Sequence, residues 1–289
     1  MERIGIVQMT SGPCVDKNLA YIEDQVCSLA KQGAKLILTP ENALVFGSKQ
    51  DYHRVAEKRN EGTIQHKLGQ LAKLHDVWLV IGSFPIQSDT GVFTTMLVFD
   101  NQGKQVSTYD KLHMFDVDVA DKHQCYRESD IFTPGAQIVT AESPVGYLGL
   151  TICYDLRFPH LYAELANQGA QIILVPAAFT EVTGKAHWEI LLRARAIETQ
   201  CWVISANQTG VHPGGRSTWG HSMVINPWGE VVGRLHQQPD NLVVDIDLSL
   251  IEQVRSKMPI RNHTRFRHCL LYTSPSPRDR SLSRMPSSA

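Results

Sequence analysis

The sequence lacks any Cys-x-x-Cys pair, any long apolar run and any excess of charge of one sign. Six scattered cysteines without such a pair indicate neither a zinc ribbon nor a redox dithiol, and we expect most of those other than Cys153 to be small buried side chains. The longest apolar runs, such as residues 77–84, are too short to cross a bilayer. A net charge of −1 gives no electrostatic reason to bind nucleic acid or an anionic membrane. We therefore expect neither as a partner.

Several familiar signals are also missing. The motifs H-E-x-x-H and G-x-S-x-G and the papain-type cysteine signature do not occur. No metal-ligand spacing is present, so we expect neither a metal nor another cofactor, and a metal-dependent hydrolase has little support. The first ten residues lack the apolar core and cleavage site of a signal peptide, which predicts a cytoplasmic protein.

Short apolar runs alternate with amphipathic segments, and this alternation predicts a layered α/β protein with both sheet faces covered. The predicted strands are residues 3–9, 34–39, 77–84, 146–153, 171–178, 201–209 and 241–248. The predicted helices are residues 16–33, 66–75, 158–170 and 187–200, and the predicted hairpins are residues 96–110 and 220–235.

One segment occurs twice in similar form. QGAKLILTPE at residues 32–41 is echoed by QGAQIILVPA at residues 168–177. The first copy ends in Glu41 and the second in Ala177, so the strand itself does not require a carboxylate there. The echo predicts two similar β-α-β halves packed together in one domain, residues 1–271. The last 18 residues, 272–289, are rich in serine, proline and arginine, resemble translated cloning sequence, and are expected to be disordered.

Cys153 lies in GLTICYDLRFP, residues 149–159, between an apolar strand and the start of a helix. A thiol at such an elbow lies close to backbone N–H groups, which can lower its pKa and bind an oxyanion. The alternative is a buried structural cysteine. Glu41 also follows a strand, and the carboxyl ends of parallel strands meet at one edge of a sheet, so the two residues can meet there. Taken alone, Glu41, Lys111 and Glu128 each have the pattern of a solvated charged residue.

Three segments together are more specific. LTPEN, YDKLHMFD and GLTICYDLRFP, in that order, resemble the nitrilase (carbon–nitrogen hydrolase) superfamily, and the resemblance covers about residues 3–266. It implies a four-layer α-β-β-α sandwich with two β-sheets, which is usually a homodimer. It also implies a catalytic triad of Glu41, Lys111 and Cys153, with Glu128 as a second carboxylate. Lys111 and the backbone N–H of Tyr154 would then receive the oxyanion.

A finer resemblance is carried by CYDLRFP, AAFTEVTGKAHWE and LLRARAIETQ. These segments are similar to the branch that contains deaminated glutathione amidase and omega-amidase. The resemblance implies that Arg157 clamps a substrate carboxylate and that Phe179 and Thr183 line the same pocket, although Arg157 could instead form a structural ion pair. The expected activity is hydrolysis of the carboxamide of a small carboxylate-bearing molecule to acid and ammonia through a thioester. An omega-amidase, an N-carbamoyl amino acid hydrolase and a catalytically inert binding scaffold are the alternatives.

Overall fold

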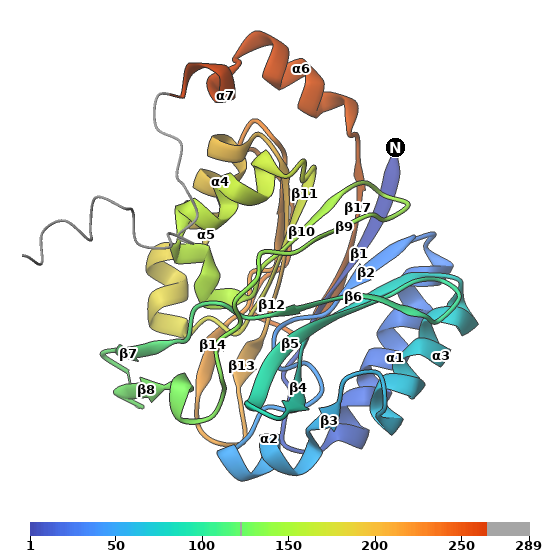
Figure 1. The fold of residues 1–289 in the computed structure, drawn as a ribbon, viewed down its shortest axis with the longest axis vertical. Coiled ribbons are helices and arrows are strands. Elements are labelled where there is room, and N and C mark those ends of the chain that lie inside the picture. Colours follow the sequence, from blue (N-terminus) through green and yellow to red (C-terminus); the bar gives the residue numbers. More distant parts are fainter. Residues whose placement is uncertain (122, 265–289) are drawn as a thin grey trace, which may run out of the picture. The chain divides into compact units, whose positions relative to one another are not determined.

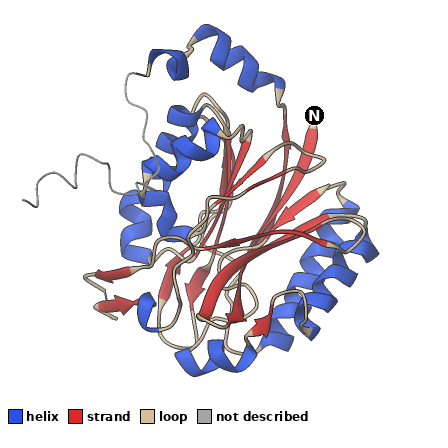
Figure 2. Cartoon of the chain, in the orientation of Figure 1, coloured by secondary structure: helices blue, strands red, loops and turns tan. Residues whose placement is uncertain are grey.

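Two large β-sheets lie at the centre of the computed structural model, which describes residues 1–121 and 123–264 (Figure 2). The chain divides into two units after Met258, and the first unit contains both sheets. The described part of the second unit contains one short helix, α7 (Ile260–His263). Cys269 and the predicted tail at 272–289 lie outside the described residues.

The first sheet joins parallel strands to antiparallel ones. Its strand order is β17 (Asp240–Ile246), β1 (Glu2–Gln8), β2 (Leu36–Leu38), β4 (Trp78–Ser88), β5 (Gly91–Phe99) and β6 (Gln105–Asp110), and β3 (Glu57–Lys58) also pairs with β4. Strands β1, β2 and β4 run parallel, whereas β17, β5 and β6 pair antiparallel with their neighbours. Since parallel strands end at the same edge, the segments that follow β1, β2 and β4 emerge together.

The second sheet repeats this arrangement. Its strand order is β16 (Val231–Arg234), β15 (Met223–Ile225), β12 (Trp202–Asn207), β11 (Ile172–Ala177), β10 (Leu148–Leu150) and β9 (Thr140–Ala141). Strands β10, β11 and β12 are parallel, and the outer pairings are antiparallel. The chain therefore contains two similar halves, β1 to β6 and β10 to β16, as the echoed segment predicts. We call these the first half and the second half.

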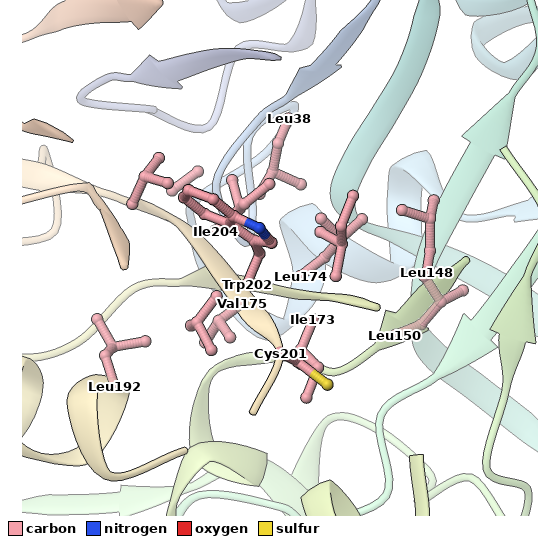
Figure 3. Close-up of a cluster of buried hydrophobic side chains, with 14 of the residues drawn as sticks. Leu38, Leu148, Leu150, Ile173, Leu174, Val175, Leu192, Cys201, Trp202 and Ile204 are labelled. Atoms are coloured by element: carbon pink, nitrogen blue, oxygen red, sulfur yellow. The ribbon is translucent and has the colours of Figure 1, made fainter. Parts of the chain in front are cut away.

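Helices cover the outer face of each sheet (Figure 1). Helices α1 (Val15–Lys31) and α3 (Thr63–His75) pack on the first sheet, and α4 (Pro159–Asn167) and α5 (Glu181–Thr199) pack on the second. In α1, for example, Leu19, Ile22, Val26 and Leu29 recur at helical spacing, and all four are buried. The inner faces of the sheets meet in a shared core, where Leu38 of β2 lies with Leu174 of β11 and Ile204 of β12 (Figure 3). The predicted four-layer α-β-β-α sandwich is confirmed.

The two echoed strands lead to one crowded point between the sheets. Pro40 follows β2, and Pro176 lies in β11. A Cβ added to Gly82 would be too close to the Pro40 carbonyl oxygen and the Pro176 side chain. Glycine is needed here because the backbones approach more closely than a side chain allows.

Several elements differ from the predictions. Helix α5 begins at Glu181, six residues before the predicted start, because the Thr180 side chain caps it by accepting from the Thr183 N–H. Helices α2 (Lys49–Val55) and α6 (Ser249–Lys257) had not been predicted, nor had two small β-ribbons. These ribbons are β7 (Asp116–Asp118) with β8 (Cys125–Arg127), and β13 (Thr209–Val211) with β14 (Ser217–Trp219).

The prediction that most other cysteines are buried was wrong: of the four that the structure describes, Cys201 is buried and Cys27 is half-buried. Cys14 and Cys125 are exposed, because Cys14 precedes helix α1 at the surface and Cys125 lies on the outer ribbon. Within residues 1–121 and 123–264, none of the helices combines the length and the apolar character needed to cross a bilayer.

Candidate active site

Glu41 is held in place by the segment that leaves β2. The residue is 3% exposed, and its main-chain oxygen accepts a hydrogen bond from Gln208. The next residue, Asn42, has a φ of 57° and donates its N–H to the Ser83 hydroxyl. Asparagine tolerates this left-handed conformation better than most residues, so the turn after Pro40 fixes where the carboxylate of Glu41 points.

Lys111 follows β6 and lies between two carboxylates. Its Nζ is 2.8 Å from Glu41 Oε1 and 2.8 Å from each carboxylate oxygen of Glu128. Burial by itself would lower the pKa of Lys111, but the charges of Glu128 and Glu41 outweigh it and hold that pKa well above its ordinary value. Burial and the nearby charge of Glu41 raise the pKa of Glu128, although Lys111 opposes this. The ammonium is thus the central charge of the cluster.

Cys153 comes from the second half and reaches the same cluster. It is the first residue of a 3-10 helix, η2 (Cys153–Arg157), and its φ of 48° is rare for a residue other than glycine. Glu41, Lys111 and the backbone of Ala178 all lie close enough to act on its thiol, and all line one cavity with it. Burial and the charge of Glu41 raise the pKa of the Cys153 thiol well above its ordinary value. Burial and the charge of Glu41 outweigh the predicted lowering by backbone groups, of which Ala178 provides one, so the thiol is protonated next to a base.

Asp155 is a buried residue of this site that the sequence analysis missed. Its Oδ2 accepts from the Ile152 N–H at 2.9 Å and from the Tyr109 hydroxyl at 2.7 Å, and its Oδ1 lies 2.7 Å from His113 Nδ1. These contacts tie the Cys153 elbow to the segment that carries Lys111. A carboxylate two residues after the cysteine, at a helix start, is a capping signal that could have been found in the sequence.

A cavity of about 120 Å³ opens beside the cluster. All eight residues that the sequence analysis proposed for the site line it: Glu41, Lys111, Glu128, Cys153, Tyr154, Arg157, Phe179 and Thr183. The cavity wall also includes Tyr126 and Arg216, which the sequence analysis did not select. Arg216 lies far along the chain from the predicted site residues, so no local pattern marks it, whereas Tyr126 lies close to Glu128 and could have been selected with it.

Arg157 lies at the cavity wall over two aromatic rings. Its guanidinium carbon is 5.8 Å from the ring centroid of Tyr154 and 5.4 Å from that of Phe179. Both terminal nitrogens are 3.3 Å from His187 Nδ1. In the described part of the chain no carboxylate forms an ion pair with Arg157, so a structural ion pair does not account for it. The charge of this arginine is available to a bound molecule.

Metal ligands do not gather at this site. Among residues 1–121 and 123–264, no group of three or more histidine, cysteine, aspartate or glutamate side chains is arranged to hold a metal ion. The chemistry that the residues present can perform is attack by a thiol on a carbonyl carbon, with Glu41 accepting the proton and Lys111 facing the developing oxyanion.

Comparisons with known proteins agree with this geometry. The carbon–nitrogen hydrolase family matches residues 3–256. A deaminated glutathione amidase of Yersinia enterocolitica is 46% identical over 266 residues, which cover 91% of this chain and 93% of that protein. The crystal structure of the Caenorhabditis elegans NitFhit protein matches with a TM-score of 0.84 at 34% identity and covers 91% of this chain and 65% of that one.

A further similar structure is a glutamate-to-glutamine mutant of the amidase from Nesterenkonia sp. AN1, in which acrylamide has added to the active-site cysteine. It matches with a TM-score of 0.76 at 28% identity and covers 91% of this chain and all of that one. The family match spans most of the chain, and the first relative is similar over nearly its whole length. This chain therefore belongs to the carbon–nitrogen hydrolase family and is a hydrolase that acts on carbon–nitrogen bonds.

Proposed function

We propose that the protein is a cysteine-dependent amidase whose substrate is deaminated glutathione. The observation that carries the proposal is the convergence of the Cys153 thiol, the Glu41 carboxylate and the Lys111 ammonium at the wall of one cavity. The relative from Yersinia enterocolitica, named a deaminated glutathione amidase, supports the choice of substrate.

The first half of the reaction forms a thioester. Glu41 takes the proton of the Cys153 thiol as the sulfur attacks the amide carbonyl carbon, and such positioned proton transfer contributes roughly 10²–10⁴ in rate. The carbon–nitrogen bond then breaks, and Glu41 passes the proton to the leaving nitrogen. The leaving group is ammonia from a primary carboxamide and cysteinylglycine from deaminated glutathione. The acyl group stays on the sulfur.

The oxyanion that forms in this step needs donors. The Lys111 ammonium provides one, and the backbone N–H of Tyr154, in the first turn of η2, provides another, because the first N–H groups of a helix have no acceptor within it. One such donor is worth on the order of 10²–10³ in rate. Glu128 holds Lys111 through both of its oxygens and so orients it.

The second half of the reaction releases the acid. Glu41 accepts a proton from a water molecule as the water attacks the thioester carbon, and the proton returns to the sulfur as the carbon–sulfur bond breaks. The raised pKa of the thiol fits this order of proton transfers. If Cys153 were a thiolate at rest, Glu41 would have no proton to accept from it.

Arg157 provides the carboxylate clamp in this proposal. A guanidinium presents a planar fork of donors that matches a carboxylate, and the rings of Tyr154 and Phe179 fix its position. Phe179 and Thr183 form the wall beside it. The acyl part of the substrate, with its terminal carboxylate, would therefore extend from Cys153 toward Arg157.

Replacement of Cys153 tests the proposal directly. In Cys153→Ala, turnover of deaminated glutathione should fall by at least about a thousandfold, since the nucleophile is lost while Glu41 and Lys111 remain. Cys14→Ala removes an exposed thiol that is not part of the cavity lining and should keep wild-type turnover. Mass spectrometry of the wild type mixed with substrate should show an acyl adduct on Cys153. Wild-type turnover in Cys153→Ala would refute the mechanism.

We also propose that the protein is a homodimer that acts in the cytoplasm. Exposed apolar side chains support the first point: Ile190 and Ile197 lie one above the other on the outer layer, along α5, and are 69% and 50% exposed. The location follows from the sequence prediction alone.

A further inference from the structure

Arg216 is a charged residue of the cavity to which the proposed reaction gives no role. It lies on the turn between β13 and β14, far along the chain from the other cavity residues. Its Nη2 donates to the main-chain oxygen of Ala178 at 2.6 Å. Since Ala178 lines the cavity together with Cys153, Arg216 is anchored next to the reacting atoms.

Planar groups hold the guanidinium of Arg216 from two sides. Its central carbon lies over the rings of Phe46 and Tyr126, 5.1 Å from each centroid. Behind Phe46 the ring of His212 stacks at 3.9 Å, and burial lowers the pKa of His212 to about 4, so it is uncharged at neutral pH. The plane of Arg216 is therefore fixed by neighbours that carry no charge to balance its own.

The donors of Arg216 are largely unused. Among the described residues it has no ion-pair partner, and its buried Nε has no hydrogen-bond partner. Glu41 and Glu128, the acidic residues of the cavity wall, are already bound to Lys111. A guanidinium carries five N–H donors, and leaving such a group partly desolvated without an acceptor is costly.

A purely structural role explains only part of this arrangement. Arg216 connects the β13–β14 ribbon to Tyr126 on β8, and this contact does help to hold both ribbons at the cavity. An apolar side chain could fill the same space between two rings without the cost of an unpaired charge. A cation with free donors, facing a cavity that already contains Arg157, which forms no ion pair among the described residues, instead indicates that the ligand supplies the acceptors.

We propose that Arg216 binds a second substrate carboxylate, on the leaving-group side of the scissile bond, while Arg157 binds the one on the acyl side. The substrate class is thus amides that carry a carboxylate at each end, and Arg216 determines that specificity. This inference rests on the proposed function. In deaminated glutathione the second carboxylate is that of the C-terminal glycine.

The experiment compares deaminated glutathione with its C-terminal carboxamide, which has one carboxylate fewer and is otherwise the same. In the wild type, kcat/KM for the dicarboxylate should exceed that for the carboxamide by about 10- to 100-fold, as expected for charge-assisted hydrogen bonds. In Arg216→Leu this ratio should fall toward one. Arg157→Leu should lower kcat/KM for both compounds and keep the ratio.

Two further variants control for charge and folding. Arg3→Leu removes the same charge at the amino end of β1, away from the cavity, and should keep the wild-type ratio. Arg216→Lys keeps the charge without the planar fork and should keep part of the ratio, which decides the question if Arg216→Leu does not fold. An unchanged ratio in a folded Arg216→Leu, equal losses on both compounds, or collapse of the ratio only in Arg157→Leu would each overturn the proposal.

Binding to Cys153→Ala, measured by calorimetry, separates this inference from the proposed function. If the dicarboxylate binds more tightly than the carboxamide, and Arg216→Leu removes the difference, the role of Arg216 stands even if the wild type does not turn over either compound. Turnover without any discrimination would support the amidase and overturn the role of Arg216. Failure of both compounds to bind would overturn both.

Discussion

At the scale of single residues, the cavity depends on buried polar groups whose protonation is set by their surroundings. His212 is 2% exposed, with Nδ1 placed 2.8 Å from the Ser11 carbonyl oxygen and Nε2 placed 2.8 Å from the Thr218 hydroxyl. The carbonyl must accept, so Nδ1 donates, and Nε2 accepts from the hydroxyl. The neutral ring therefore satisfies both of its partners, whereas a second proton would add a buried positive charge close to Arg216.

The lowered pKa of His212 predicts a loss of stability in acid. The folded ring titrates at about 4 and the unfolded one near its ordinary value, so the unfolded state takes up the proton first as the pH falls. This group alone should cost about 3 kcal/mol of unfolding free energy between pH 7 and pH 4. Urea unfolding of His212→Gln should show a smaller decrease over that range than the wild type. An equal decrease in both would contradict the assignment, and exposed His66→Gln is the control.

Residue identities could be predicted only where they belong to a recognisable segment. Glu41, Lys111 and Cys153 lie in three short motifs, and their positions in the fold followed from the strand ends. Arg216 could not be found, because nothing beside it in the sequence differs from an ordinary turn, and Tyr126 was passed over although it lies close to Glu128 in the chain. The net rise in the pKa of Cys153 could not be predicted, since burial and the nearness of Glu41 depend on the packed sandwich.

At the scale of elements, the close packing of the two sheets determines the position of Glu41. Gly82 in β4 fits between Pro40 and Pro176, and its N–H donates to the Thr39 hydroxyl at 3.0 Å. The strand β4 is irregular in its pairing with β5 beside this glycine. A larger residue at this position must push the segment that carries Glu41 away from the second half.

Gly82→Ala should therefore destabilise the fold by roughly 1–3 kcal/mol, as overpacking of a close contact does. It should also lower kcat, because Glu41 follows the displaced Pro40 directly. Thermal unfolding and turnover measure the two effects. Gly214→Ala is a suitable control, since an added Cβ there has no atom within 4 Å. Wild-type stability in Gly82→Ala would contradict the prediction, because it would mean that the sheets leave room for an added methyl group at this position.

The pattern of elements was predictable to the extent that it was periodic. The long helix α1 has a clear helical period and the central strands are continuous apolar runs, and their order along the chain and their layers were correct. Helix α5 was predicted to begin too late because its first turn contains Thr183 and Gly184, which are weak helix formers. The hydrogen bond from the Thr183 N–H to the Thr180 side chain stabilises this turn in spite of them. The two ribbons were missed because strands of three residues show no measurable alternation.

At the scale of the whole molecule, the proposed dimer would cover the apolar outer side of the second half. Trp228, 53% exposed, lies in the turn next to Gly229, and a Cβ on Gly229 would touch Ile197. Ile197 and this turn therefore form a continuous surface with Ile190 on α5. Exposed apolar side chains gathered in this way are typical of an interface.

Ile190→Asp should convert the dimer to a monomer at the same protein concentration, because it places a charge in the apolar contact. Size-exclusion chromatography with light scattering gives the mass of each variant. Leu74→Asp is the matched control, since Leu74 is 77% exposed on α3 at the other outer layer and should not change the mass. A monomeric wild type would refute the dimer.

The two halves do not contribute equally to the chemistry. The Glu41 carboxylate and the Lys111 ammonium come from the first half, whereas the Cys153 thiol comes from the second. A chain that is still being synthesised thus carries Glu41 and Lys111 before Cys153 has been added. Even after Cys153 has been added, its thiol has no base until the two sheets pack together. An incompletely folded molecule therefore cannot be acylated by substrate. The appearance of activity reports that the sheets have packed.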